Sequence, residues 1–327
     1  MTPIYKYQHL IDTNKLNWNY LSGNVNAIPL LEQNIEKINW AWLSQNPNAI
    51  HILEKYPHKI EWIGLSSNKN AIYLLEQNLD KVNWSNLTTN INAIHILKNN
   101  LDKIDFRYLD LNKNPQAISI LENYLLTTTI PHDIWIYLSA RPHSIHLIEK
   151  HLDKINWGYL SMNKNAIHIL EQNLNRINWI YLSANENAIH LLESNLDKIH
   201  WYSLSTNEKA IPIIEKNLHK IKWDGLSLNS NAIHILEQNL DKVNWENLSL
   251  NPNAMPILSH PNNIHKINWD NLSKNPNLFE LDYLAMSKQR TKIIEHELIA
   301  QALHPSRISK WLIYYLANGK DICDFEY

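Results

Sequence analysis

Six histidines of this chain recur at one position of an internal repeat, eleven residues after a tryptophan. They are His51, His95, His146, His168, His190 and His234. Imidazole can hold a metal ion or carry a proton near neutral pH, so this column is the first feature that could do chemistry. A metal ion needs several ligands within about 2 Å, whereas equivalent atoms of stacked neighbouring repeats are expected roughly 8–10 Å apart. An HxxE pair such as His168 with Glu171 offers two ligands, and nothing at a fixed spacing supplies a third.

We therefore predict no metal site at these histidines. On a helical wheel they point away from the apolar centre of their segment, so we expect them to face solvent or a groove. Their protonation would make that surface basic. They remain candidate contacts for a partner.

Serine also recurs, four residues after the aromatic anchor in ten repeats. A catalytic serine is single and needs an oriented base and an oxyanion hole. Ten copies at one repeat position instead indicate helix ends that make local hydrogen bonds. Recurring glutamates and lysines balance one another, and neither a GxGxxG nor a GxxxxGK[ST] phosphate-binding motif is present. We predict that the chain is not an enzyme and carries no cofactor.

A second column, two residues after the anchor, holds aromatic residues that the repeat itself does not require. Its members are Tyr20, Trp42, Tyr137, Tyr159 and Tyr181, with Tyr108 nearby in an irregular repeat. These rings could pack between neighbouring helices, grip a protein or peptide, or stack on the bases of a single-stranded nucleic acid. The formal charge of −2 and the pI near 6.8 disfavour phosphate binding, so nucleic acid is the weakest of the three.

The elements that position these columns follow from a 22-residue repeat. Its aromatic anchors are Trp18, Trp40, Trp62, Trp84, Phe106, Trp135, Trp157, Trp179, Trp201, Trp223, Trp245 and Trp269. A leucine follows each anchor by three residues, and the consensus is close to INWxxLSxNxNAIHILEQNLDK. The fifth repeat is longer, and we place two extra residues within 106–112 and about five more around 125–131.

Each repeat is predicted to form two short helices. Asparagine before the tryptophan suits the N-cap of the first helix. We place the cap of the second helix at Asn26 and its equivalents, which puts Pro29 in the first turn. Asparagines such as Asn34 are expected to end that helix in a left-handed conformation.

Units this small must bury their apolar faces against their neighbours, so we predict an all-α solenoid of about twelve two-helix repeats with terminal caps. The predicted divisions are an N-terminal cap (1–16), the array (17–277, irregular at 106–134) and a C-terminal helical cap (278–327). We expect an open arc on the order of 100 Å long, with each indole shielded by the adjoining repeat. A leucine-rich-repeat fold is the alternative, but its alternating leucines are missing. No run of 18 apolar residues predicts a membrane span.

The repeat also resembles a known type. The stretch Asn39-Trp40-Ala41-Trp42-Leu43-Ser44-Gln45-Asn46-Pro47-Asn48-Ala49-Ile50-His51-Ile52-Leu53-Glu54 is similar to the tandem repeats of many uncharacterised proteins of giant, mimivirus-like DNA viruses of amoebae. The resemblance covers roughly residues 17–280, and the closing His304-Pro305-Ser306-Arg307 resembles tails of those proteins. It implies a viral protein that acts in the host cytoplasm or is packaged in virions. It implies no catalytic residue.

The leading hypothesis is therefore a non-enzymatic repeat scaffold that binds a host or viral protein or peptide along an extended surface. The alternatives are a single-stranded nucleic-acid reader that uses the aromatic column and a structural component of a virion or filament.

Overall fold

The structure is a computed structural model that describes residues 5–7, 12–109, 112, 114–127 and 132–317. The chain divides into two compact units. One unit runs from Tyr7 to Phe279 and holds all the repeats, and the other combines Met1–Lys6 with Glu280–Tyr327. Described separately, they are a helical repeat array and a pair of longer helices.

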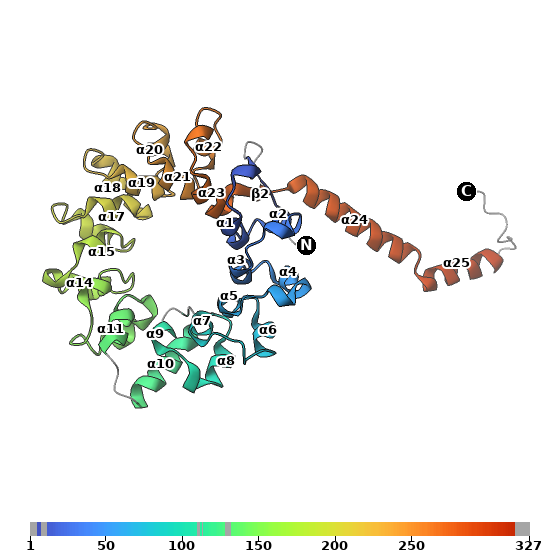
Figure 1. Cartoon of the computed structure of the whole chain (residues 1–327), viewed down its shortest axis with the longest axis horizontal. Coiled ribbons are helices and arrows are strands. Elements are labelled where there is room, and N and C mark those ends of the chain that lie inside the picture. Colours follow the sequence, from blue (N-terminus) through green and yellow to red (C-terminus); the bar gives the residue numbers. More distant parts are fainter. Residues whose placement is uncertain (1–4, 8–11, 110–111, 113, 128–131, 318–327) are drawn as a thin grey trace. The chain divides into compact units, whose positions relative to one another are not determined.

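The repeat unit confirms the predicted all-α architecture of two short helices per repeat. The first helices are α1 (Trp18–Gly23), α3 (Trp40–Gln45), α5 (Trp62–Ser67), α7 (Trp84–Thr89), α9 (Phe106–Leu109), α11 (His132–Ser139), α13 (Trp157–Leu160), α15 (Trp179–Ser183), α17 (Trp201–Thr206), α19 (Trp223–Leu228), α21 (Trp245–Leu250) and α23 (Trp269–Lys274). In Figure 1 they lie side by side along the inner side of a ring. We call them the inner layer.

The second helices form an outer layer around them (Figure 1). They are α2 (Ile28–Glu32), α4 (Ile50–Lys55), α6 (Ile72–Glu76), α8 (Ile94–Lys98), α10 (Pro115–Thr127), α12 (Ile145–Ile148), α14 (Ile167–Glu171), α16 (Ile189–Glu193), α18 (Ile211–Lys216), α20 (Ile233–Glu237) and α22 (Met255–Leu258). Single 3₁₀ turns flank several of them: Ile35–Lys37, Pro57–Lys59, Leu101–Lys103, Pro142–Ser144, Leu174–Arg176, Glu208–Ala210, Ile264–Lys266 and Pro276–Leu278.

Two kinds of buried polar residue join each repeat to the next. The serine four residues after the anchor donates to the anchor's carbonyl oxygen, as Ser22 does to Trp18 at 2.7 Å. Its oxygen also accepts the backbone N–H just before the next anchor, as Ser22 does from Asn39 at 2.9 Å. The sequence predicted the first of these bonds but not the second, which crosses between repeats.

The asparagine six residues after each anchor makes the other inter-repeat bonds. Asn46 is buried, and its side-chain amide donates to the carbonyl oxygens of Ser22 and Asn24 in the preceding repeat at 3.1 and 3.0 Å. Its own oxygen accepts the N–H of Asn48 at 3.0 Å. One side chain thus satisfies three backbone groups at the repeat boundary, which explains its burial.

The predicted helix starts and ends are partly right. Asn39 caps α3 by accepting the N–H groups of Ala41 and Trp42, as expected. Asn26 does not cap α2: the cap position is Ala27, and the amide of Asn26 instead donates to Pro276 in a neighbouring repeat. Pro29 does lie in the first turn of α2.

Asn34, Asn173 and Asn217, which follow outer helices, have φ between −138° and −134° and are not left-handed, contrary to the prediction. Asn34 has φ −138° and ψ 52°. Its side-chain amide donates to the carbonyl oxygen of Leu30, four residues earlier, at 2.9 Å. A side-chain bond therefore ends the helix without a left-handed residue.

The anchor leucines form the core, while most anchor tryptophans are only half-buried. Leu21 and its equivalents are fully buried, and Trp135 is the one buried indole among the described repeats. A cation from the end of the same repeat lies over most of the indoles, as Lys37 lies over Trp18 with Nζ 4.7 Å from the ring centroid. The expected shielding of each indole by the adjoining repeat is therefore shared with this lysine.

The array is not an open arc, because its first and last repeats pack against each other (Figure 1). The N–H of Asn17 donates to Ser273, and the amide of Asn24 donates to the carbonyl oxygens of Ser273 and Asn275. The same bonds join most neighbouring pairs of repeats in the described part of the array, as between Asn46 and Ser22 and Asn24. The predicted open form is wrong because the sequence pattern sets the packing of neighbours but not the small rotation from one repeat to the next.

Residues before the first anchor complete the last repeat. The 3₁₀ turn Thr13–Lys15 lies after the cap Asp12, and Nζ of Lys15 lies 5.3 Å from the ring centroid of Trp269. Leu16 is buried. The segment before Trp18 therefore provides the last repeat with a 3₁₀ turn and a lysine, which other repeats have at their own C-terminal ends. It was predicted as part of an N-terminal cap at 1–16, of which residues 1–4 and 8–11 lie outside the described structure.

The long fifth repeat keeps its place in the ring. Asn112 donates to Thr88 and Asn90, and Asn114 donates to Ile91, so both make the usual inter-repeat bonds. The two extra residues therefore do not lie within 106–112 as predicted. They follow Asn114 and lengthen α10, and the second predicted insertion falls partly at 128–131, outside the described residues.

The second unit contains two longer helices, α24 (Tyr283–Ala302) and α25 (Pro305–Ala317). Pro305 is the first residue of α25. Two short strands, β1 (Tyr5–Tyr7) and β2 (Phe279–Leu281), pair as a two-stranded sheet, which the sequence did not predict.

Candidate partner-binding site

One face of the inner-layer helices is turned away from the buried leucines of the core. Residues three and four after the anchor, such as Leu160 and Ser161, are fully buried. At 100° per residue, the residues one, two and five after the anchor lie on the opposite side of the helix. Because the outer layer covers the buried side, these three positions line the inside of the ring. We call this surface the inner face.

Aromatic and apolar side chains gather on the inner face of repeats six to nine. Tyr137 and Tyr159 are 45% and 39% exposed, and Tyr181 is half-buried. The rings of Tyr159 and Tyr181 stack, with centroids 5.9 Å apart and planes 19° apart. We call this group, with Ile180 and Tyr202, the tyrosine arc.

The sequence missed part of this arc because it tested only the column two residues after the anchor. Ile180 and Tyr202 follow their anchors by one residue and are 52% and 43% exposed. Met162 follows its anchor by five residues and is also exposed. The signal was present: large apolar residues at positions that face away from the core indicate a surface with another use.

Two further predicted aromatics, Tyr20 and Trp42, form a separate cluster near the point where the ring closes. Their ring centroids are 6.0 Å apart and their planes are 70° apart. Nζ of Lys274, from the last repeat, lies 4.0 Å from the centroid of Tyr20. These residues line a pocket of about 280 Å³ that we call the seam pocket.

The aromatic column is therefore divided and does not form one continuous ladder. Gly64 and Gly225 occupy the column between the two clusters. A Cβ on Gly64 would lie 2.9 Å from the carbonyl oxygen of Ala41, and one on Gly225 would lie 2.8 Å from that of Tyr202. Neighbouring backbones approach so closely there that a side chain larger than hydrogen does not fit.

The six predicted histidines lie on the other layer, away from the aromatic rings. Each is the second residue of an outer helix and contacts a glutamate of the preceding repeat through Nε2. The pairs are His51–Glu32, His95–Glu76, His146–Glu122, His168–Glu149, His190–Glu171 and His234–Glu215, at 2.6 to 3.1 Å. His168 and Glu171 thus have different partners and do not form the two-ligand pair considered from the sequence.

Tyr73 replaces histidine at the same position in the third repeat, and its hydroxyl donates to Glu54. Burial of the hydroxyl, the hydrogen bond and the negative charge of Glu54 together raise the pKa of Tyr73 to about 12. Glu54 therefore accepts a hydrogen bond from a neutral phenol, whereas the equivalent glutamates of other repeats contact imidazoles. The arrangement is one of structural pairing between repeats.

Neither layer contains the elements of a metal centre: no group of three or more His, Cys, Asp or Glu side chains in the described ranges is placed to hold an ion. Likewise, none of the helices in the described part of the chain combines the length and apolar character needed to cross a membrane.

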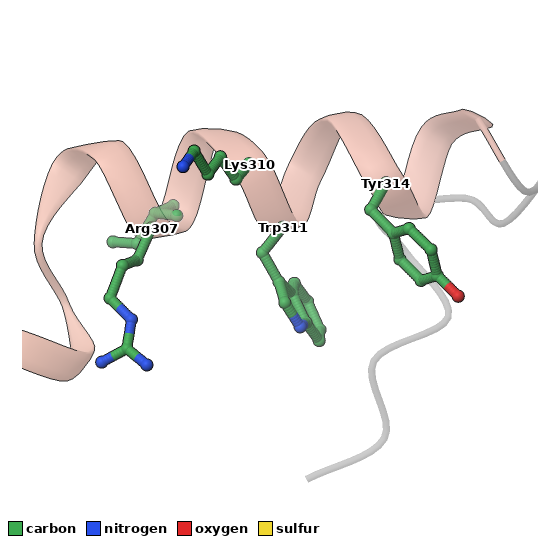
Figure 2. A pocket seen from close by; sticks show the side chains of 5 residues that line it. Arg307, Lys310, Trp311 and Tyr314 are labelled. Carbon is green, nitrogen blue, oxygen red and sulfur yellow. The ribbon is translucent and has the colours of Figure 1, made fainter.

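The second unit has a pocket of its own, of about 570 Å³, along α25. Arg307, Trp311 and Tyr314 extend to one side of the helix and Lys310 lies on another, as Figure 2 shows. The five lining residues in the described structure all come from this one helix. The tyrosine arc differs because four successive repeats build it.

Comparison of the chain with protein-family models, with curated proteins and with solved structures gave no match.

Proposed function

We propose that the ring is a non-enzymatic scaffold that binds a protein or peptide segment on the tyrosine arc. One observation carries the proposal: Tyr137 and Tyr159 are large aromatic residues that remain 45% and 39% exposed on the side of their helices opposite the buried leucines. Leucine, serine and asparagine make the ring, and they recur in nearly every repeat. Tyrosine two residues after the anchor occurs in three of the four repeats of the arc and, outside it, at Tyr20 and Tyr108.

Tyrosine suits such a surface because it offers a large contact area at low conformational cost and keeps a hydroxyl for hydrogen bonding. The stacked Tyr159 and Tyr181 hold each other's orientation before a partner arrives. A preorganised aromatic pair loses less side-chain freedom on binding than two independent rings do. Ile180, between them in sequence, adds apolar area.

The charge around the arc favours a polypeptide over a nucleic acid. In repeats six to nine, no lysine or arginine follows the anchor by one, two or five residues. The next three repeats place Asp224, Glu246 and Asp270 on the inner face. A single-strand binder needs cations along its aromatic rings to neutralise phosphates. A filament of stacked arrays is disfavoured too, because the first and last repeats already contact each other.

The test is selection of binding peptides from a random library on the immobilised full chain, followed by titration of the selected peptide against matched variants. Tyr159→Asn and Tyr181→Asn use the residue that Asn86, Asn247 and Asn271 supply at the same position, so they preserve the repeat. We expect each to weaken binding about tenfold or more, as loss of an aromatic hot spot does.

The control is His168→Gln on the outer layer, which leaves the arc intact. Equal binding by the tyrosine variants and the wild type would exclude the arc as the site. A filter-binding assay with a single-stranded oligonucleotide at low salt tests the alternative, and we expect no retention. On the resemblance of the repeats to those of giant viruses, we place this activity in the host cytoplasm or in the virion.

A further inference from the structure

The seam pocket lies where three repeats meet: the last, the first and the second. Tyr20, Gly23 and Asn24 come from the first repeat, Trp42 and Gln45 from the second, and Lys274 from the last. It therefore exists only because the ring closes. The tyrosine arc belongs to other repeats, so the pocket is a separate site.

Three of its residues occur nowhere else at their positions, which vary from repeat to repeat. Gly23 is the only glycine five residues after an anchor, and Lys274 is the only basic residue at that position. Trp42 is the only tryptophan two residues after an anchor. Repeat packing requires none of the three, since other repeats carry other residues there. The three side chains line one and the same pocket.

Each of these three residues shapes the pocket. A Cβ on Gly23 would lie 3.1 Å from Cε3 of Trp42, so the glycine makes room for the indole against α1. Tyr20 and Trp42 present an edge-to-face pair of rings, which leaves apolar faces toward the pocket. Lys274 adds an ammonium group within 4.0 Å of the Tyr20 ring centroid.

The polar groups of the pocket select the charge of the ligand. The amide of Asn24 is already used by Ser273, Asn275 and Asn26. The ammonium of Lys274 lies 3.5 Å from the side-chain oxygen of Asn271, and among the described residues no carboxylate forms an ion pair with it. Its positive charge is therefore available to an anion, and it disfavours a cationic ligand between the rings.

The size of the pocket limits the ligand to one side chain. Sites for drug-sized molecules occupy about 300–1,000 Å³, and the seam pocket has about 280 Å³. That volume suits a single indole or phenyl group with the atoms next to it. We propose that the seam pocket binds an aromatic carboxylate: the ring packs against Tyr20 and Trp42, and the carboxylate accepts hydrogen bonds from Lys274.

Such a group has two sources, the carboxyl-terminal aromatic residue of a polypeptide and a free aromatic acid. The inference goes beyond the function proposed above, because it concerns a different site and needs no partner that binds the tyrosine arc. If binding at the tyrosine arc fails its test, the proposal for the seam pocket is unaffected, and the reverse also holds, because the two tests use different probes and variants.

The probes are N-acetyl-L-tryptophan, its amide, and a hexapeptide that ends in tryptophan with a free carboxylate. Binding is followed by nuclear magnetic resonance through the indole N–H of Trp42 in the full-length protein. We expect the acid to bind about tenfold more tightly than the amide, the size of a charge-assisted hydrogen bond. Tighter binding of the peptide than of N-acetyl-L-tryptophan identifies a chain terminus as the ligand, and no gain identifies a free acid.

Two variants and a matched control make the test specific. Lys274→Leu, which copies Leu228 and Leu250 of the neighbouring repeats, should equalise the affinities for acid and amide. Gly23→Thr, which copies Thr89 and Thr206, should weaken both by filling the pocket. Ala184→Thr makes the same kind of change at the same position of a distant repeat and should alter neither.

The proposal is wrong if the wild type does not distinguish acid from amide, or if Lys274→Leu keeps the preference. It is also wrong if no probe shifts the Trp42 resonance. Because the replacing residues are native to this position of the repeat, an unchanged thermal transition for each variant separates loss of binding from loss of fold.

Discussion

The backbone N–H of Asn17 donates to the hydroxyl oxygen of Ser273 at 2.8 Å, across 256 residues of sequence. Asn39 and Ser22, in adjacent repeats, make the same bond at 2.9 Å. The first and last repeats are thus joined as any two neighbours are. As far as the structure describes the ring, every repeat has a neighbour on both sides, and the first and last repeats are not open ends.

This closure predicts that Ser273 matters as much as a serine in the middle of the ring. Ser273→Ala and Ser249→Ala should each lower the free energy of unfolding by about 1–3 kcal/mol, because each leaves a partly buried backbone N–H without its acceptor. In an open array, Ser273 would accept no bond from another repeat, and its replacement would cost much less. Chemical denaturation of the two variants side by side distinguishes these cases.

A second prediction concerns the asparagines six residues after the anchor. Asn185 donates to the carbonyl oxygens of Ser161 and Asn163 and accepts the N–H of Asn187. Asn185→Ala should therefore destabilise the fold by about 3 kcal/mol or more, since several buried groups lose their partners. Asn187→Ala removes one more exposed bond, to Lys164, and should cost about 1 kcal/mol or less. Similar losses for both variants would contradict the assigned roles.

A third prediction separates the folding role of the inner helices from their proposed binding role. Leu160 is fully buried, and Leu160→Ala should cost about 2–5 kcal/mol through the cavity it leaves. Its neighbour Tyr159 is exposed, and Tyr159→Asn should cost no more than about 1.5 kcal/mol, the value of a stacked aromatic pair. Thermal unfolding of both variants checks the expectation. A large loss for Tyr159→Asn would assign the ring to packing.

A fourth prediction follows from the raised pKa of Tyr73. The folded protein keeps this phenol neutral up to about pH 12, whereas the unfolded chain ionises it near its ordinary value of 10.0. Between these two pH values the unfolded state binds fewer protons, so this residue's contribution to stability falls as the pH rises. Ultraviolet titration of phenolate absorbance, compared with Tyr73→His, isolates its transition. A pKa of 10.0 for Tyr73 in the folded protein would exclude the arrangement with Glu54.

Sequence periodicity was sufficient to predict the helices because burial depends on local pattern. The leucine three residues after each anchor is buried wherever the structure describes it, as the helical reading required. Asn39 caps its helix as expected. The pattern also placed Pro29 in a first turn, since proline restricts the backbone irrespective of its neighbours.

Features that depend on neighbouring repeats were missed. Asn24 and Asn26 look alike in sequence, yet Asn24 joins three backbone groups and Asn26 reaches a single carbonyl. The closure of the ring could not be predicted from the sequence either, because only a small difference in the rotation from one repeat to the next distinguishes an open arc from a closed ring. The predicted aromatic column was found on one face, but its division at Gly64 and Gly225 depends on backbone distances that no pattern reveals.

Closure also restricts how such a protein can evolve. An open array gains or loses a copy of its unit at little cost, because only the position of its end changes. Here a thirteenth copy would have to change the angle at every existing junction, including the one between Asn17 and Ser273. Adding a single unit would therefore disturb the whole ring, whereas replacing exposed side chains leaves its circumference unchanged.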